Sequence, residues 1–153
     1  MKKDSPIEFS FLSLDDFEDL KEMVLALYKE NGYGEKITIQ KIKTTINELS
    51  VNSMRGAIYI FKRLEKIVGY AILIFYWSNE YGGNIIHIDE LYVKPPFRRQ
   101  GIATQFLEFI KIKYRRSTKA IQLEVTKTNK KALIFYIKSG FILNENQGMI
   151  KKL

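Results

Sequence analysis

The chain has 153 residues, of which 46% are hydrophobic and 27% charged, and this composition predicts a single soluble domain spanning residues 1–153. It contains no cysteine and one histidine, His87, which excludes disulfides, thiolate metal ligands and metal centres with several histidines. The 25 Lys and Arg residues exceed the 17 Asp and Glu residues by a net charge of +8, which predicts an anionic partner, with nucleic acid as the first candidate.

Most of the surplus charge lies in one segment, residues 94–131. This segment contains eleven Lys and Arg residues and only two acidic residues, Glu108 and Glu124, so its net charge is +9. The remainder of the chain is close to neutral. The anionic partner is therefore expected at this third of the chain, although a solvated basic helix face gives the same pattern.

No part of the chain predicts a targeting signal or a membrane span. The N-terminal residues are mixed in character rather than an apolar signal core. The longest apolar stretch, residues 67–77, is too short to cross a bilayer and contains Gly69. We therefore expect a cytoplasmic protein without a membrane partner.

The N-terminal half predicts two helices followed by an antiparallel meander. Alternating apolar residues predict a strand at 7–12, and Ser13 is a favourable N-cap for a helix that continues to about Tyr28. Thr38 caps a second helix that ends near residue 49. Strands joined by turns are expected at residues 56–64, 67–77 and 85–93.

The C-terminal half alternates helices and strands. Pro95 and Pro96 end the 85–93 strand, because proline cannot donate a hydrogen bond to a strand ladder. The remaining elements are a helix at 102–114, a strand at 120–125, a helix from Asn129 to residue 139 that Gly140 terminates, and short strands at 141–143 and 149–153. The order β-α-α-β-β-β-α-β-α-β-β predicts an α+β fold, in which four helices flank a mixed, mostly antiparallel sheet of six to seven strands.

The stretch after the 85–93 strand combines the features of an anion site. A turn with Arg98 and Arg99 follows the strand, and Gly101 opens a helix. A helix N-terminus leaves backbone N–H groups unpaired and carries the positive end of the helix dipole, so it favours phosphate. Gly101 and Ala103 are small enough for a pyrophosphate to approach the backbone. The stretch is neither a Walker loop nor a dinucleotide fingerprint, because it lacks the residues that define them.

Two blocks of the sequence resemble the GNAT family of N-acetyltransferases. The first, Arg98-x-x-Gly101-x-Ala103, matches that family's Arg/Gln-x-x-Gly-x-Gly/Ala signature, with Ala103 where many members have glycine. The second is Asn129-x-x-Ala132-x-x-x-Tyr136, followed by Ser139-Gly140-Phe141. The order of the predicted elements also agrees, so the resemblance covers essentially the whole chain.

The resemblance implies acetyl-CoA as co-substrate, no metal, and a set of coenzyme-binding residues. The main chain of Leu91, Tyr92 and Val93 would pair with the pantetheine arm, in a slot where this strand splays from the 120–125 strand. Asn129, in the block that includes Ala132, would hydrogen-bond the pantetheine. Tyr136 would protonate the leaving thiolate; without the resemblance it is predicted to be a core aromatic. The turn that would bind the pyrophosphate comprises Arg98, Arg99, Gln100, Gly101, Ile102, Ala103 and Thr104.

Carboxylates on the 85–93 strand are candidates for the base that deprotonates an amine acceptor. Consecutive strand residues face opposite sides, so only one of Asp89 and Glu90 faces the cleft unless a bulge turns both inward. The resemblance to polyamine and aminoglycoside acetylating members favours Asp89, and His87 shares its face. The alternative is that these groups are solvated or ion-paired at a strand end.

In proteins of the family that the chain resembles, the acceptor pocket usually involves the loop between the first two helices and the turn after the third strand, and the resemblance implies the same regions here, the latter being the turn after the 67–77 strand. Aromatic and acidic side chains there suit a cationic amine, although several of the aromatics also fit a core position. The candidates are Tyr28, Tyr33, Glu35, Tyr76, Trp77, Glu80 and Tyr81.

With the resemblance, these features predict an acetyl-CoA-dependent N-acetyltransferase that transfers the acetyl group directly to a primary amine of a small molecule, whether polyamine-like, amino-acid-like or an antibiotic. The alternative within the same fold acetylates a protein N-terminus or lysine. A non-catalytic acyl-CoA-binding protein and a basic nucleic-acid-binding module are further alternatives. Because the surplus charge surrounds the expected coenzyme turn, we expect no nucleic-acid partner. Relatives often dimerise, so a second copy of the chain is an expected partner.

Overall fold

The computed structural model describes residues 5–32, 35–146 and 148–152, and it forms one five-stranded sheet with helices on both faces. None of the helices in these residues is both long and apolar enough to cross a membrane. The elements in chain order are β1 (Glu8–Phe11), a short 3-10 turn η1 (Leu14–Asp16), α1 (Phe17–Asn31), α2 (Ile39–Val51), β2 (Gly56–Arg63), β3 (Lys66–Ser78), β4 (Gly83–Val93), a second 3-10 turn η2 (Pro95–Phe97), α3 (Ile102–Tyr114), β5 (Thr118–Leu123) and α4 (Lys130–Lys138).

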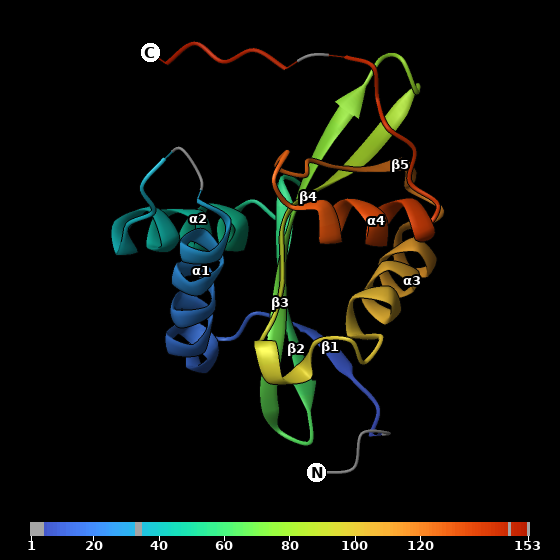
Figure 1. The fold of residues 1–153 in the computed structure, drawn as a ribbon. Helices are drawn as coiled ribbons and strands as arrows, with labels where there is room; N and C mark the ends of the chain where they lie inside the picture. The colour runs from blue at the N-terminus through green and yellow to red at the C-terminus, as the bar shows by residue number, and fades with distance from the viewer. Residues whose placement is uncertain (1–4, 33–34, 147, 153) are drawn as a thin grey trace.

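The strands lie in the order β1-β2-β3-β4-β5 (Figure 1). The first four pair antiparallel with their sequence neighbours, whereas β5 pairs parallel with β4. A parallel pair needs a crossover connection, and α3 supplies it. The predicted mixed, mostly antiparallel α+β fold with four helices is therefore confirmed.

Two apolar clusters hold the helices against the sheet. Helices α1 and α2 cover one face and α3 and α4 the other (Figure 1). On the first face Leu20 and Val24 of α1 pack on Tyr70 of β3. On the second face Phe106 of α3 packs on Phe61 of β2, with their ring centroids 4.6 Å apart. These clusters fix the positions of the helix ends relative to β4.

The prediction of C-terminal strands at 141–143 and 149–153 is wrong for the residues that the structure describes. Residues 141–146 and 148–152 form no strand, so the described sheet has five strands rather than six to seven. This segment instead crosses the top of the molecule away from the sheet (Figure 1), and Ile142 and Met149 are 93% and 95% exposed. Strand propensity alone forms no ladder, because a strand needs a neighbouring edge to pair with. In addition, β5 spans Thr118–Leu123 rather than residues 120–125.

Candidate functional site

A β-bulge interrupts β4 at Asp89. Across the ladder with β3, Ile88 pairs with Leu73 and Glu90 pairs with Ile72, which leaves Asp89 without a partner. An extra residue of this kind shifts the alternation of side chains between the two faces. Ile88 and Leu91 both pack in the cluster beneath α3, so Asp89 and Glu90 both turn to the face of α1 and α2. The sequence predicts that Asp89 and Glu90 share a face only if β4 contains a bulge, and the structure contains that bulge.

Beyond the bulge, β4 no longer pairs with β5. The parallel ladder ends at Ile88 and Leu123, while β4 continues to Val93. The Lys94 N–H donates to Val68 on the β3 side, and backbone groups alternate in direction along an antiparallel pair. Leu91 and Val93 therefore turn their N–H and C=O groups away from β3, into the gap beside β5, whereas the Tyr92 backbone faces β3.

The turn that follows β4 connects the strand to the N-terminus of α3, which lies at the end of this gap. Gly101 is the N-cap of α3 with φ +75°, and no side chain caps the helix. An added Cβ at Gly101 meets only Gln105, at 3.8 Å, so the left-handed backbone rather than crowding favours glycine here. Arg99 is also left-handed, with φ 62°. The uncapped N–H groups and the dipole of α3 suit an anionic ligand, as the sequence predicts.

The cations that flank this turn are largely held by α1. Arg98 Nη2 contacts the Glu30 carboxylate oxygens at 2.8 and 3.0 Å, and Arg98 Nε donates to the Val93 carbonyl at 2.7 Å. The guanidinium also lies over the Tyr92 ring. Lys94 forms an ion pair with Asp19 at 2.8 Å. Arg98 therefore ties the turn to the end of α1, a role that its position in the motif did not indicate.

The second sequence block forms the start of α4 and its inner face. Asn129 caps the helix, its Oδ1 accepting from the Ala132 N–H at 3.1 Å, and its Nδ2 donates to Asn31 of α1 at 3.4 Å. Tyr136 is half-buried, and its ring packs against Phe135 and Phe141 in the cluster under α3 and α4. Tyr136 therefore approaches the sheet from the face opposite to Asp89.

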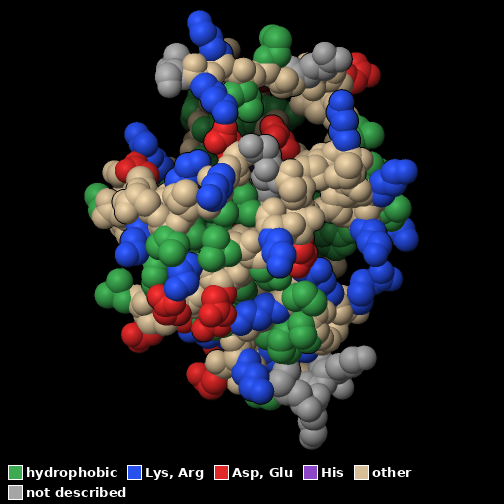
Figure 2. All heavy atoms as spheres, turned by 60° about the vertical axis from the view of Figure 1, so that its left-hand side comes forward, with side chains coloured by type: hydrophobic (Ala, Val, Ile, Leu, Met, Phe, Trp, Pro, Cys, Tyr) green, Lys and Arg blue, Asp and Glu red, His purple; other side chains and the backbone are tan. Residues whose placement is uncertain are grey.

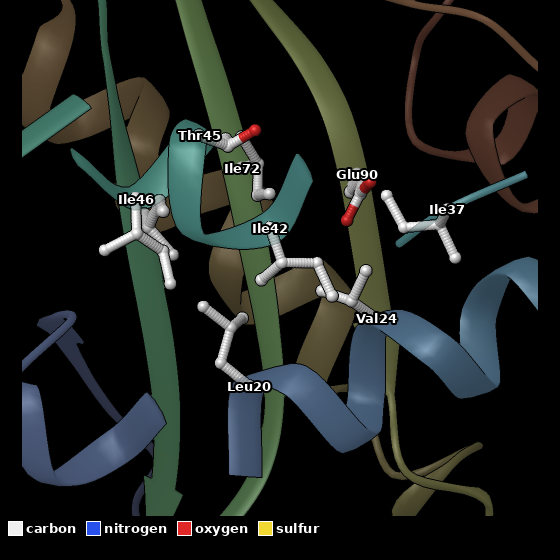
Figure 3. A pocket seen from close by; sticks show the side chains of 9 residues that line it. Leu20, Val24, Ile37, Ile42, Thr45, Ile46, Ile72 and Glu90 are labelled. Carbon is white, nitrogen blue, oxygen red and sulfur yellow. The ribbon is translucent and has the colours of Figure 1, made fainter. Parts of the chain in front are cut away.

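Glu90 is enclosed by the helix layer rather than open to a cleft. The residue is 7% exposed and lines an apolar cavity of about 20 Å³, room for a single water, together with Leu20 and Ile42 (Figure 3). Its carboxylate accepts from the Tyr70 hydroxyl at 2.6 Å, and Tyr28 also hydrogen-bonds it. Burial raises the pKa of Glu90, those two hydrogen bonds oppose the rise, and the Asp89 charge adds to it.

Asp89, in contrast, is half-exposed beside other polar groups of β4 and β5. Its Oδ1 lies 4.0 Å from His87 Nε2, which shares its face as predicted. Partial burial raises the pKa of Asp89; the His87 ring lowers it and the Glu124 carboxylate raises it further. Asp89, His87 and Glu124 thus form one polar group at the point where β4 and β5 part.

The remaining acceptor candidates are not all brought to Asp89. The Tyr76 hydroxyl contacts Gln122 of β5. Trp77 is 66% exposed and lines a separate cavity of about 470 Å³ with Lys113 and Tyr114 of α3. Glu80 and Tyr81 are exposed near the end of the β3–β4 hairpin. Tyr33 lies outside the described residues. Tyr28 lies at the site only through its bond to Glu90.

Sequence reasoning gave no role to Gln122, Glu124, Glu30 or Asn31. Gln122 and Glu124 are two positions apart in the β5 region, so the alternation of side chains along a strand predicts that they share a face. Glu30 and Asn31 lie beyond the predicted end of the first helix near Tyr28, and the sequence does not indicate their contacts, because their partners are distant in the chain. Among the described residues, no three His, Asp or Glu side chains are grouped to hold a metal ion.

Comparison with known proteins identifies the family. The family model for the acetyltransferase (GNAT) family matches residues 17–141. The chain belongs to the GNAT family. No curated protein matches the chain significantly.

Solved structures share the fold at low sequence identity. A possible acetyltransferase from Clostridium difficile 630 is 21% identical with a TM-score of 0.83, over 96% of this chain and 97% of that chain. A predicted acetyltransferase from Clostridium acetobutylicum, solved with acetyl-CoA, is 21% identical with a TM-score of 0.74, over 95% and 96%. An aminoglycoside acetyltransferase from an uncultured soil metagenomic sample, in complex with sisomicin, is 15% identical with a TM-score of 0.72, over 96% and 95%.

The environment of Glu90 predicts a pH-dependent effect of its removal. The pKa of Glu90 in the folded chain lies above the ordinary value of 4.5. The contribution of protonated Glu90 to the free energy of unfolding is therefore fully present below pH 4.5, and it is lost as the pH rises through the raised pKa. Glu90→Gln stays neutral at every pH. The difference in free energy of unfolding, variant minus parent, should therefore rise between pH 4 and pH 8, measured by urea denaturation. The exposed control Glu22→Gln should show no such trend, and a difference for Glu90→Gln that does not change with pH contradicts the argument.

Proposed function

We propose that the chain transfers the acetyl group of acetyl-CoA directly to a primary amine of a small molecule. The observation that carries this proposal is the parting of β4 from β5 after Ile88. It leaves the N–H and C=O groups of Leu91 and the N–H group of Val93 unpaired by β5, beside the uncapped N-terminus of α3, while the Val93 carbonyl accepts from Arg98 Nε. An extended amide arm fits the first feature and a pyrophosphate the second, which together match the pantetheine and phosphate parts of coenzyme A.

The side chains around this gap supply the proton transfers that acetyl transfer to an amine requires. Asp89 takes the proton from the ammonium group, directly or through a water, so that the amine lone pair can attack the thioester carbon. Tyr136 gives its hydroxyl proton to the sulfur as the carbon–sulfur bond breaks, and the second proton, which the nitrogen loses after it has attacked, returns through solvent to the tyrosine oxygen. Because Asp89 and Tyr136 lie on opposite faces of the sheet, they reach the gap from opposite sides. Glu90, enclosed under α2, holds Tyr70 and Tyr28 instead of acting as base.

Charge and enclosure on the acceptor side support a small, cationic amine. Asp89 and Glu124 provide negative charge there. The C-terminal segment crosses above the α1 and α2 face, with a hollow beneath it in Figure 2, and Lys152 forms an ion pair with Glu35 before α2. Such a crossing segment narrows the approach for a folded protein substrate more than for a small molecule. The aminoglycoside acetyltransferase with a similar fold is consistent with this acceptor class.

Coenzyme binding at the turn tests the first half of the proposal. Isothermal titration with acetyl-CoA should give binding to the parent chain, and Gly101→Glu should weaken it about tenfold or more. The reason is that a negative charge at the N-terminus of α3 opposes a phosphate, an effect of about 1–2 kcal/mol.

Gly82→Glu is the matched control, because Gly82 has a similar φ of +60° and open surroundings but lies on the β3–β4 hairpin. Absence of binding to the parent, or equal affinity in both variants, contradicts the proposal. Salt-dependent DNA binding in a gel shift without coenzyme affinity would favour the nucleic-acid alternative.

The role of Asp89 predicts both a rate and a pH effect. Asp89→Asn should lower kcat/KM for the amine by roughly 10²–10⁴-fold without changing coenzyme affinity. Glu124→Gln removes a charge that raises the pKa of Asp89, so the acidic limb of the kcat/KM profile should move to lower pH.

These rates are measured by thiol release over a panel of small amines and peptides, with Asp15→Asn in the exposed N-terminal turn as control. Unchanged rates in Asp89→Asn contradict its role as base. A peptide preference would favour the protein acetyltransferase alternative, and binding without turnover of any amine would favour the non-catalytic one.

The role of Tyr136 predicts a loss confined to turnover. Tyr136→Phe keeps the ring packing on Phe141 and removes the hydroxyl group that would donate the proton, so kcat should fall by a much larger factor than coenzyme affinity does. Tyr114→Phe is the control: it removes a hydroxyl that pairs with Tyr59 at 2.7 Å, away from the gap. Pre-steady-state thiol release and titration give the two quantities, and an equal loss in both would make Tyr136 a binding residue.

A further inference from the structure

A buried, uncompensated positive charge lies behind the turn that precedes α3. Arg63, the last residue of β2, is 2% exposed. Within the described part of the chain its guanidinium has one hydrogen bond, from Nη1 to Gln100 Oε1 at 2.6 Å, and its buried Nε has no partner. Arg63 forms no ion pair with any acidic side chain in the described part of the chain. Guanidinium stays protonated in proteins, so this is a permanent buried cation.

The position of Arg63 relates it to α3 rather than to the hairpin in which it stands. Its neighbour Lys62 turns to the opposite face and pairs with Asp16 at 2.9 Å. Gln100, the partner of Arg63, immediately precedes the N-cap Gly101, and Gln100 Nε2 also donates to the Pro96 carbonyl at 3.1 Å. Gln100 is therefore clamped between Arg63 and η2, which fixes the backbone that leads into α3.

Besides the exposed Arg99, two sources of positive potential thus converge on this turn without an anionic partner in the part of the chain that the structure describes. One is the uncapped N-terminus of α3, and the other is the Arg63 guanidinium. The buried cation costs free energy unless an anion offsets it. Arg98, the motif arginine, is already neutralised by Glu30, so it does not fill this role.

We propose that Arg63 is a positioning residue for a pyrophosphate-bearing ligand, holding the turn through Gln100 and supplying the buried counter-charge behind it. The inference rests on the proposed function in identifying that ligand as coenzyme A. It adds a residue of β2, more than thirty positions before the motif, to the recognition of the phosphates.

The two roles of a buried arginine predict opposite signs in two measurements. A purely structural Arg63 stabilises the ligand-free chain, so Arg63→Met would lower its melting temperature. A counter-charge for a ligand costs stability until the ligand binds, so the ligand-free Arg63→Met chain should melt at the same or a higher temperature than the parent. Coenzyme A should then raise the melting temperature of the parent more than that of Arg63→Met.

Calorimetric titrations isolate the phosphate-dependent part. Arg63→Gln and Arg63→Met should weaken coenzyme A binding by roughly ten- to hundredfold, the range for losing a charge-assisted contact. Affinity for pantetheine, which lacks the phosphates, should stay within about twofold. Arg63→Lys, which keeps the charge, should restore most of the coenzyme A affinity. Lys66→Met is the matched control, because Lys66 is the exposed cross-strand partner of Arg63.

The outcomes separate this inference from the proposed function. Coenzyme A binding that is the same in the parent and the Arg63 variants overturns the role of Arg63 and leaves the function standing. A parallel loss of pantetheine and coenzyme A affinity, with a lower melting temperature, also overturns it in favour of a structural role. If the parent does not bind coenzyme A, the proposed function fails, and inorganic pyrophosphate then tests Arg63 by the melting shift that it should give in the parent and not in Arg63→Gln.

Discussion

The arrangement of this site depends on a change of partner along β4. As far as Ile88 the strand is paired on both sides, and from Asp89 onward it keeps only β3. Backbone N–H and C=O groups need partners when they are enclosed, so both groups of Leu91 and the N–H of Val93 form a row that an extended amide can pair with, whereas the Val93 carbonyl already accepts from Arg98 Nε. The bulge at the same point brings the Asp89 side chain to the start of this row. The end of the β4–β5 ladder and the bulge in the β3–β4 ladder thus coincide, and Asp89 lies where the gap begins.

The two adjacent acids on β4 show how surroundings separate chemical roles. Glu90 is enclosed between α1, α2 and the sheet, where two tyrosine hydroxyls hold it. Asp89 keeps access to solvent and to His87 and Glu124. Both pKa values are raised, mainly by burial, but only Asp89 has the access to solvent that the proposed proton exchange with an amine requires. Proximity in the sequence therefore says little about which of the two would act.

The positively charged residues near the turn also differ in role according to their surroundings. Lys94 and Arg98 lie in the basic segment, yet both are paired with carboxylates of α1 and serve to fix the turn. Arg63, in contrast, lies outside that segment and has no acidic partner among the described residues, although it is close to the turn. Net charge by sequence position therefore indicates the region of an anion site better than it indicates the residues that form it.

The sequence by itself determined the element order from β1 to α4, the helix caps at Thr38 and Asn129, and the start of α3 at Gly101, because each is set by local periodicity and backbone preference. It also limited the main candidates for the base of the proposed reaction to Asp89 and Glu90. Only the tertiary structure showed that both acids turn to the same face of the sheet, since the bulge is a property of the β3–β4 ladder. It likewise decided that residues 141–143 form no strand, because they do not pair with either edge of the sheet, and it decided the contacts of Arg63, Glu30 and Asn31, whose partners are distant in the chain.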